Sequence, residues 1–312
     1  MVGGCFVLWI SYYVGGQIAT VPLLQNQKIE IMQSLILPNS LLSSLIAFWL
    51  TLLNAFLLTQ LSNRFTLIRS RTFLPIFIFL LLMSTWNETH IVSGSQPALT
   101  LFIIALFFIL SMFHDLKASE EAFMGSLLIS ISSLLINPLI FIIPVFWIGF
   151  AILRCFSLRT FLASILGTLV PLILYVAGHY LLNPDTDYLK LFNLDVSFNF
   201  DLYSYSLPDL IYLGSLVIIM MICLAGMFSI YSRDAIHSRK KLNLLLLLLI
   251  SFSVLSIVYE NQFASFLPFI ALLNSFLASH PFTLKQNDFY GILFIIFCAL
   301  NIAYIISKYI VF

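Results

Sequence analysis

Residues 242–259 read LNLLLLLLISFSVLSIVY, a stretch of 18 residues without a charged side chain. Arg239, Lys240 and Lys241 precede the stretch and Glu260 follows it, so the charges lie only at its two ends. An α-helix rises about 1.5 Å per residue, and about 20 apolar residues therefore cross the ~30 Å hydrocarbon core of a bilayer. This stretch predicts a membrane-spanning helix.

The composition of the whole chain points to the same environment. Of its 312 residues 61% are hydrophobic and 9% are charged, and the mean hydropathy is +1.07. A soluble domain is about half apolar and about one quarter charged, so this chain cannot cover itself with polar surface. Backbone groups that face lipid must find hydrogen-bond partners within their own segment. The sequence therefore predicts an all-α, polytopic transmembrane helical bundle.

Apolar stretches recur along the chain, and we expect about eleven spans in a single integral membrane domain, residues 1–312, because there is no internal repeat. The spans lie at about 5–24, 41–62, 73–86, 97–113, 122–136, 139–153, 160–182, 210–231, 242–259, 263–279 and 289–311. Residues 122–153 allow two interpretations, a hairpin of two short spans or one long helix kinked at Pro138 and Pro144. The Asn137-Pro138 pair is typical of a turn and favours the hairpin.

The basic residues predict the orientation. With this threading, three basic residues fall in one set of loops, Lys28, Lys190 and Lys308, whereas the other set holds Arg64, Arg69, Arg71, Lys117, Arg154, Arg159, Arg233, Arg239, Lys240, Lys241 and Lys285. Lys and Arg concentrate in cytoplasmic loops, which predicts an inner (cytoplasmic) membrane protein with its N-terminus inside and its C-terminus outside. No basic run exceeds three residues, and the sequence gives no sign of nucleic-acid binding.

Two segments on the predicted outer side are more than short connections. The first, at about 25–40, carries Ile29, Met32, Leu35 and Ile36 on one helical face, which is typical of a helix lying along the membrane surface. The second, at about 183–209, is rich in aspartate. Within it apolar and polar side chains alternate over residues 196–203, which predicts an extended strand.

Three outer residues are candidates for catalysis. Glu30 can act as a general base or a cation ligand, or it can be a solvated charge beside Lys28. Glu88 and His90 lie in the sequence WNETH, residues 86–90, which brings together the polar groups needed to orient a hydroxyl acceptor. An ordinary polar turn is the alternative for these residues.

Further outer residues are candidates for binding a substrate or a cation. Asp185 and Asp187 are two residues apart and can share a divalent cation, or both can be solvated. His179 lies near the outer end of its span, either facing a cavity or at the membrane interface. Glu260 belongs to the polar sequence ENQ, residues 260–262, which connects two spans. The four cysteines are isolated, and no metal site is expected.

Some absences bear on function. No predicted span has a charged residue at its centre, which argues against proton relays and ion-coupled transport. Two matching halves with interrupted helices are also missing, so a transporter becomes less attractive.

One stretch resembles a known class of enzymes. Residues 120–182 read EEAFMGSLLISISSLLINPLIFIIPVFWIGFAILRCFSLRTFLASILGTLVPLILYVAGHYLL. They are similar to the middle of the GT-C class of glycosyltransferases that use polyprenyl-phosphate sugars: a small-residue span, a polar residue and proline at the outer turn, a short return span, a basic hinge and a long span. The whole chain also resembles multi-pass inner-membrane proteins of Bacteroidota, a likeness that brings no function with it.

The first resemblance implies a bundle of roughly a dozen helices whose first outer loop holds an acidic residue that activates the acceptor. Glu30 occupies the matching region, with Glu88 second. The acidic pair usual in the class is reduced here to Glu30, and the outer basic residues that grip a lipid phosphate are limited to Lys28, Lys190 and Lys308. A basic side chain or a divalent cation would stabilise the departing phosphate in this mechanism, and the sequence does not identify a cofactor.

Two other functions stay open beside it. A non-catalytic accessory subunit would dock an envelope protein through residues 183–209, for instance by strand addition. A lipid carrier is the third alternative. Membrane lipids are partners in every case.

Overall fold

The computed structural model describes residue 9 and residues 41–68, 72–182, 207–230, 235–259, 262–284 and 288–310. In these ranges every regular element is helical. The predicted first span at 5–24, apart from Trp9, the surface helix at about 25–40 and the strand at 196–203 lie outside the described residues.

Six helices of the described ranges are long and apolar enough to cross a bilayer. They are α3 (Leu41–Phe65), α8 (Leu158–Leu182), α9 (Leu207–Ile230), α10 (Ile236–Val258), α11 (Phe263–Leu284) and α12 (Asp288–Ile310). The remaining elements are shorter: α4 (Leu74–Thr85), the 3₁₀ helix η1 (Asn87–His90), α5 (Ser95–Ser111), α6 (Ser119–Leu135), the 3₁₀ helix η2 (Asn137–Phe141) and α7 (Ile142–Ile152).

Each predicted span from residue 41 onward coincides with one of these helices. The four shorter α-helices have 11 to 17 residues, or roughly 17–26 Å, which is less than the thickness of the hydrocarbon core. Within the described ranges the structure therefore supports six full-length spans, and it does not support the prediction of eleven. One boundary also differs, because the predicted loop at 183–209 ends early: Leu207, Pro208 and Asp209 form the first turn of α9, where proline and an acidic side chain are both favourable.

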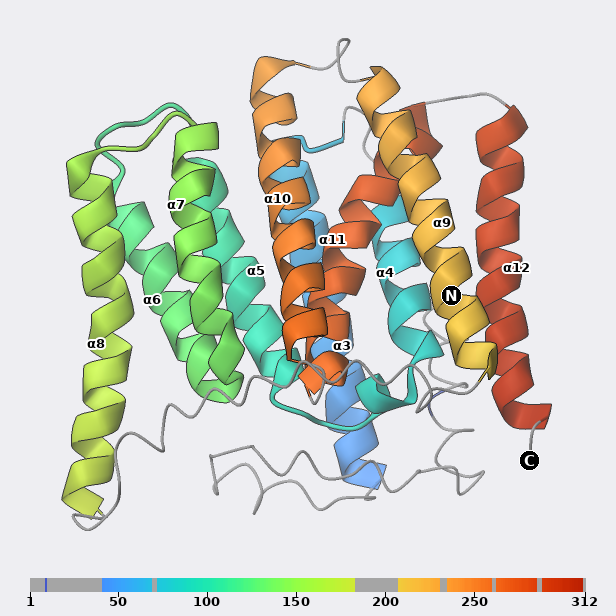
Figure 1. Ribbon diagram of the computed structural model, residues 1–312, viewed down its shortest axis with the longest axis horizontal. Coiled ribbons are helices and arrows are strands. Elements are labelled where there is room, and N and C mark those ends of the chain that lie inside the picture. Colours follow the sequence, from blue (N-terminus) through green and yellow to red (C-terminus); the bar gives the residue numbers. More distant parts are fainter. Residues whose placement is uncertain are drawn as a thin grey trace.

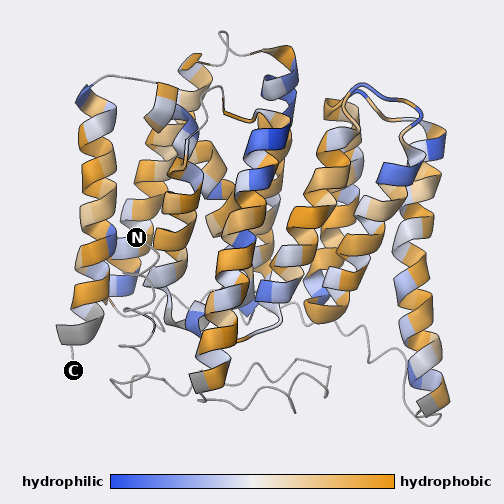
Figure 2. Ribbon diagram, turned by 180° about the vertical axis from the view of Figure 1, so that it is seen from behind, coloured by the Kyte–Doolittle hydropathy of each residue, from blue (hydrophilic) through white to orange (hydrophobic). Residues whose placement is uncertain are grey.

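Successive helices run in opposite directions, so their connections alternate between two edges of the bundle (Figure 1). The upper rim holds residues 66–68, 112–118 and 153–157 and the start of α10. The lower rim holds residues 86–94 and 136–141 and the start of α9. Hydrophobic residues dominate the middle of the helices, and hydrophilic turns gather near the helix ends (Figure 2).

The chain reverses direction between α6 and α7, as the hairpin interpretation predicts. Ile136 has φ −135° and ψ 98°, an extended conformation that ends α6. Pro138 then lies in the first turn of η2, where its missing N–H leaves no helical hydrogen bond unmade. One long helix kinked at the two prolines is excluded by this break.

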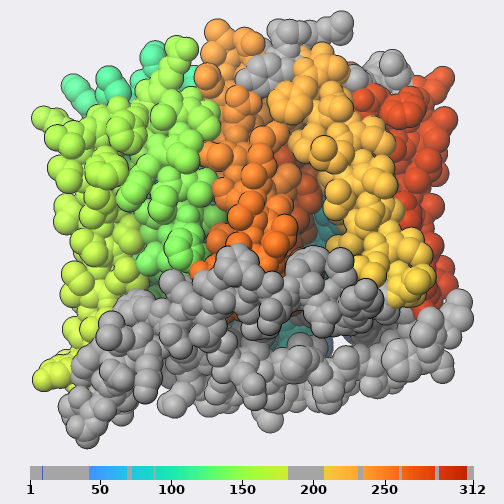
Figure 3. Space-filling model, viewed as in Figure 1, coloured from blue at the N-terminus to red at the C-terminus, as the bar shows by residue number. Residues whose placement is uncertain are grey.

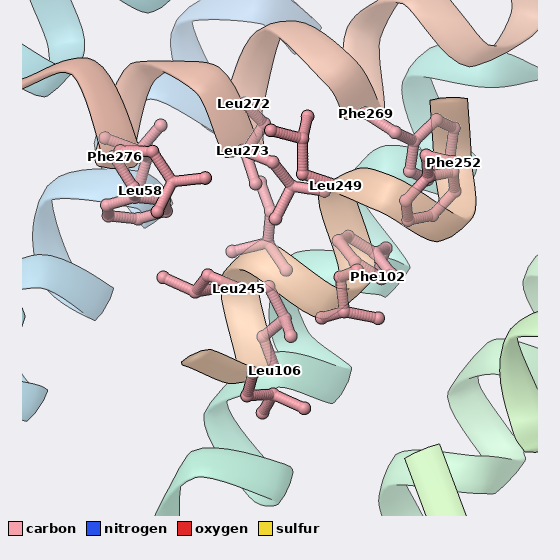
Figure 4. Packing of buried hydrophobic residues seen from close by; sticks show 14 of the residues in the cluster. Leu58, Phe102, Leu106, Leu245, Leu249, Phe252, Phe269, Leu272, Leu273 and Phe276 are labelled. Carbon is pink, nitrogen blue, oxygen red and sulfur yellow. The ribbon is translucent and has the colours of Figure 1, made fainter. Parts of the chain in front are cut away.

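The core surrounds α11, which packs against α10, α4, α9 and α5. In its apolar window 83% of the residues are buried, compared with 17% for α8. Phe269 of α11 stacks on Phe252 of α10 at 4.9 Å between ring centroids, and both meet the edge of Phe102 of α5 at 5.2–5.4 Å. Figure 4 shows these rings interleaved with leucines from α3, α5, α10 and α11. Lipid does not reach α11, whereas α8 stands at one end of the bundle.

Close approach of two backbones holds α8 on α6. A Cβ added to Gly167 would lie 2.4 Å from the carbonyl oxygen of Phe123. Nearby, the hydroxyl of Ser130 donates to the carbonyl of Thr168 at 2.7 Å. Small residues at a helix interface allow this kind of packing in membranes, where apolar burial alone does not drive helices together.

Candidate functional site

Most of the predicted site residues fall outside what the structure describes. Six belong to this group: Lys28, Glu30, Asp185, Asp187, Lys190 and Glu260. The backbone of Glu88 lies in η1 at the lower rim, and its side chain is not among those described. The roles of these residues stay predictions.

His90 is described, and it is a buried side chain in a compact turn. It ends η1 with 4% of its surface exposed, and its ring lies 4.5 Å from the indole of Trp9. The hydroxyl of Thr89 donates to the carbonyl of Trp86 at 2.6 Å, and the side-chain Nε2 of Gln96 donates to the carbonyl of Thr89 at 2.6 Å. The Trp86–His90 turn is therefore tied down by buried hydrogen bonds.

His179 lies elsewhere. It is half-buried on α8, with its ring 6.4 Å from that of Tyr175. The helix α8 packs against α6 and α7, whereas η1 packs against α3, α4 and α11. The two histidines thus belong to different parts of the bundle and do not meet in one site.

The lower rim contains a polar and aromatic group that the sequence had not indicated as a site. We call it the tyrosine–aspartate cluster, and its members are Thr85, Trp86, Asp209, Tyr212, Asn301 and Tyr304. They come from the end of α4, the start of α9 and the second half of α12, and all except the half-buried Asp209 are buried. The cluster brings a carboxylate, an amide and three aromatic rings to one end of an apolar bundle.

Two reciprocal hydrogen bonds join α9 and α12 in this cluster. The hydroxyl of Tyr304 donates to Oδ1 of Asp209 at 2.6 Å, and the hydroxyl of Tyr212 donates to Oδ1 of Asn301 at 2.8 Å. The two tyrosine rings stack between these bonds, with centroids 4.0 Å apart and planes 10° apart. Each helix therefore supplies one tyrosine and one acceptor.

Trp86 closes the cluster on the side of α4. Its ring lies 5.7 Å from that of Tyr212 and 6.0 Å from that of Tyr304. The same residue immediately precedes Asn87 and Glu88 in the chain. The cluster thus anchors the start of the turn that carries two of the predicted catalytic residues.

The helix end favours a charge at Asp209. Asp209 lies in the first turn of α9, where the free backbone N–H groups and the helix dipole favour a negative side chain. A hydrogen bond from the phenol of Tyr304 adds a second favourable interaction. A carboxylate in this setting can bind a hydroxyl or a cation, or it can accept a proton.

The spacing of these residues is visible in the sequence. Asp209 and Tyr212 read DLIY, and Asn301 and Tyr304 read NIAY, so the members of each pair lie three positions apart and share a helix face. What the spacing cannot supply is the pairing of the two helices, whose bonded residues lie 95 and 89 positions apart.

No group of three or more His, Cys, Asp or Glu side chains that could hold a metal ion occurs among the residues that the structure describes. Asp209 is the only one of these residue types in the tyrosine–aspartate cluster. A cation at this rim would need further ligands from outside the described ranges.

Taken together, the six long apolar helices and the polar groups gathered at their ends define a multi-pass helical membrane protein. Comparison of the chain with family models, with curated proteins and with solved structures finds no match. The functional argument therefore rests on the fold and on the residues of the lower rim.

Proposed function

We propose that this protein is a GT-C-like glycosyltransferase of the inner membrane, which transfers a sugar from a polyprenyl-phosphate donor to an acceptor at the lower rim. The observation that carries the proposal is the tyrosine–aspartate cluster. It supports Asp209 at the start of α9 and fixes Trp86, so that the backbone of Glu88 and the carboxylate of Asp209 belong to the same rim. Two carboxylates at one end of a lipid-embedded bundle suit a reaction between a lipid-linked donor and a polar acceptor.

The topology that goes with this function has eleven crossings, an inner N-terminus and an outer lower rim. Alternating helix directions support it (Figure 1). So do the basic residues Arg64, Lys117, Arg154, Arg159, Arg239, Lys240 and Lys241, all of which lie at or near the upper rim, the edge that would face the cytoplasm. In this topology α4, α5, α6 and α7 cross a bilayer thinned around them, or complete their crossings with η1 and η2.

The lipid part of the donor would enter from the side. In Figure 3 α11 lies between α9 and α10, and a small part of α4 is visible beside it. A polyprenyl chain lying along this face would place its phosphate and sugar at the level of the cluster.

In the proposed reaction, Glu30 or Glu88 takes the proton of the acceptor hydroxyl. The acceptor oxygen then forms the new bond to the sugar carbon as the bond from that carbon to the lipid phosphate breaks. Lys28, Lys190 or a divalent cation stabilises the departing phosphate, and Asp209 holds the acceptor against the tyrosine and tryptophan rings. His90, buried at the end of the Trp86–His90 turn, positions Glu88, while Asp185, Asp187 and Glu260 bind the substrate or its cation. His179 lies on α8, away from η1, and has no part in this reaction.

The test is sugar transfer from a lipid-linked donor in membranes that contain the variants. Glu30→Gln and Glu88→Gln are made singly and together, and Asp209→Asn is made separately. We expect the double variant to lose activity at least 100-fold, because general acid–base catalysis contributes about 10²–10⁴-fold. The control is Asp288→Asn, which removes an exposed carboxylate from the first turn of α12 at the upper rim. Full activity in the double variant would overturn the assignment of these roles.

A second candidate function is a non-catalytic accessory subunit that binds an envelope protein. The exposure of α8 favours it: few of its residues are buried, and a shallow apolar hollow of about 400 Å³ is lined by Leu172, Ile173, Val176, Ala177 and Tyr180. The segment that follows α8 is the predicted docking loop. Deleting residues 196–203 should then abolish co-purification of a partner without unfolding the bundle. Purification of the intact protein alone, together with binding of a lipid-linked sugar, would refute this function.

A further inference from the structure

The upper rim contains a lysine that is buried along most of its side chain and has no polar partner among the described residues. Lys241 lies in the second turn of α10, and 8% of its surface is exposed. No ion pair or hydrogen bond joins its Nζ to any residue that the structure describes. An ammonium group placed among apolar and aromatic side chains loses part of its hydration, so its position here needs a reason.

Aromatic rings supply part of that reason. The Nζ of Lys241 lies 4.9 Å from the ring centroid of Phe65 and 5.8 Å from that of Phe113. These rings come from the end of α3 and from the residues just after α5. Cation–π contacts of this kind contribute about 0.5–2 kcal/mol each, and less where the ring is shared.

The ring of Phe65 is shared by two cations. The guanidinium carbon of Arg64 lies 5.7 Å from the centroid of Phe65, the ring that Lys241 also contacts. Arg64 is exposed and lies in the last turn of α3. Two positive charges around one ring repel each other, and an anion between or above them would remove the repulsion.

The start of α10 adds to the positive potential. Its residues 237–241 read HSRKK, and its first turn contains no acidic residue. Cations at a helix N-terminus oppose the helix dipole, and the free N–H groups there favour an anion instead. The N-cap residue Ala235 makes no side-chain hydrogen bond to these groups.

The three helix ends are held together, and we call the group of basic and aromatic side chains that they bring together the notch. The hydroxyl of Ser238 donates to the carbonyl of Thr66 at 3.1 Å, which ties α10 to the end of α3. The ring of His237 lies 6.5 Å from that of Phe113. Asp115 follows Phe113 by two positions and carries a carboxylate at the upper rim. Its side chain is exposed and accepts a hydrogen bond from the backbone N–H of Lys117 at 2.8 Å. It does not neutralise Lys241.

We propose that this notch, formed by Arg64, Phe65, Phe113, His237 and Lys241, binds a phosphate group, and that its source is the headgroup of an anionic phospholipid. The notch lies at the end of membrane-spanning helices, at the level of lipid headgroups. The exposed side chain of Ile236 beside it, with 62% of its surface accessible, offers a contact for an acyl chain. The site is on the opposite rim from the tyrosine–aspartate cluster and is independent of the proposed function.

The experiment uses the purified full chain in detergent and measures the shift of Tm on titration with phosphatidylglycerol, phosphatidylcholine or inorganic phosphate. The variants are Lys241→Met and Arg64→Gln, with Lys117→Gln as the control for an exposed lysine of the same rim. We expect phosphatidylglycerol to raise the Tm of the native protein and of Lys117→Gln, with at least tenfold weaker binding to Lys241→Met and Arg64→Gln. Without lipid, Lys241→Met should be about as stable as the native protein, because methionine removes a partly desolvated charge while filling much of the same space.

Each outcome decides something. A similar shift with inorganic phosphate would keep the phosphate site and replace the lipid as its source. Equal weakening in Lys117→Gln would show that only diffuse surface charge attracts the lipid, and unchanged binding to both Lys241→Met and Arg64→Gln would reject the notch as a site. Because Arg64 is exposed, its variant tests the proposal even where the substitution at Lys241 prevents folding.

Discussion

A single methyl group at Gly167 should disrupt the contact between α6 and α8. In Gly167→Ala the new Cβ would lie 2.4 Å from the carbonyl oxygen of Phe123, 3.2 Å from the carbonyl carbon of the same residue and 3.2 Å from the backbone nitrogen of Leu127. These atoms belong to the backbone of a helix, so they cannot turn aside as a side chain can. Ordinary contact begins near 3.4 Å, and the two helices must therefore separate by about 1 Å.

The cost of that separation can be worked from the contacts at the interface. The hydrogen bond from Ser130 to the carbonyl of Thr168, 2.7 Å long, would stretch beyond bonding distance and forfeit about 0.6–1 kcal/mol. A gap of this size also removes a quarter to a half of the dispersion energy of each contact across it. Overpacking costs about 1–3 kcal/mol in total, sometimes more, and the better helix propensity of alanine returns somewhat under 1 kcal/mol. The net loss should be about 0.2–2 kcal/mol.

The assay is thermal unfolding of the purified protein in detergent, and the matched control is Gly178→Ala. Gly178 lies on the same helix, and a methyl group added to it would meet no atom within 4 Å, so alanine there adds helix propensity alone. At roughly 2–4 °C per kcal/mol, the Tm of Gly167→Ala should fall by about 0.5–8 °C, whereas the Tm of Gly178→Ala should stay or rise. Equal Tm values for the two variants would refute the close backbone approach.

Two further predictions concern the rims. Burial raises the pKa of the Cys155 thiol from its ordinary value of 9.0 to about 11. Alkylation of this thiol should therefore be slow at pH 8, and its rate should rise with a midpoint near pH 11. Because the unfolded chain loses this proton at lower pH than the folded protein, the free energy of unfolding should fall between pH 9 and pH 11. A midpoint near 9 in the folded protein would contradict this. In a cysteine-free background, an impermeant maleimide should label Leu207→Cys in intact cells but Lys117→Cys only after permeabilisation. Both positions are exposed, and residue 207 lies at the lower rim whereas residue 117 lies at the upper rim. The reverse labelling pattern would show that the proposed orientation is inverted.

Helix positions could be predicted from the sequence because two independent signals coincide at their ends. Residues 242–259 are apolar and end at charges, and α10 covers nearly all of them; at Asn137-Pro138 the turn chemistry coincides with a real break in the helix. Which helices cross the bilayer completely could not be predicted as well. The spans expected at 73–86 and 139–153 match the positions of α4 and of η2 with α7, yet hydropathy does not tell a short buried helix from a full crossing.

The candidate site was harder to predict because it is made between distant segments. Polar and charged residues on the outer side are the natural candidates in the sequence, yet His90 is buried beneath a turn and His179 stands on the most exposed of the long helices. The residues that do meet are tyrosines within apolar helices, where aromatic side chains are common and ordinarily anchor or pack. The sequence places Asp209 in an acidic loop, and only the fold shows that it begins α9 and faces Tyr304.

The two reciprocal hydrogen bonds between α9 and α12 allow a neutral acceptor, Asn301, to be compared with a charged acceptor, Asp209. Asn301 accepts from Tyr212 at 2.8 Å with a neutral amide, which shows that an amide suffices to join a stacked tyrosine to the neighbouring helix. Asp209 accepts from Tyr304 in the matching position but brings a charge to a half-buried place. An asparagine would hold the same bond without desolvating a charge, but it would lose the attraction between the carboxylate and the free N–H groups at the start of α9. Asp209→Asn should therefore lower the Tm only slightly, since a helix-dipole interaction contributes about 0.3–1 kcal/mol. Sugar transfer should fall far more than this loss of stability accounts for, a combination that a purely structural cluster would not give.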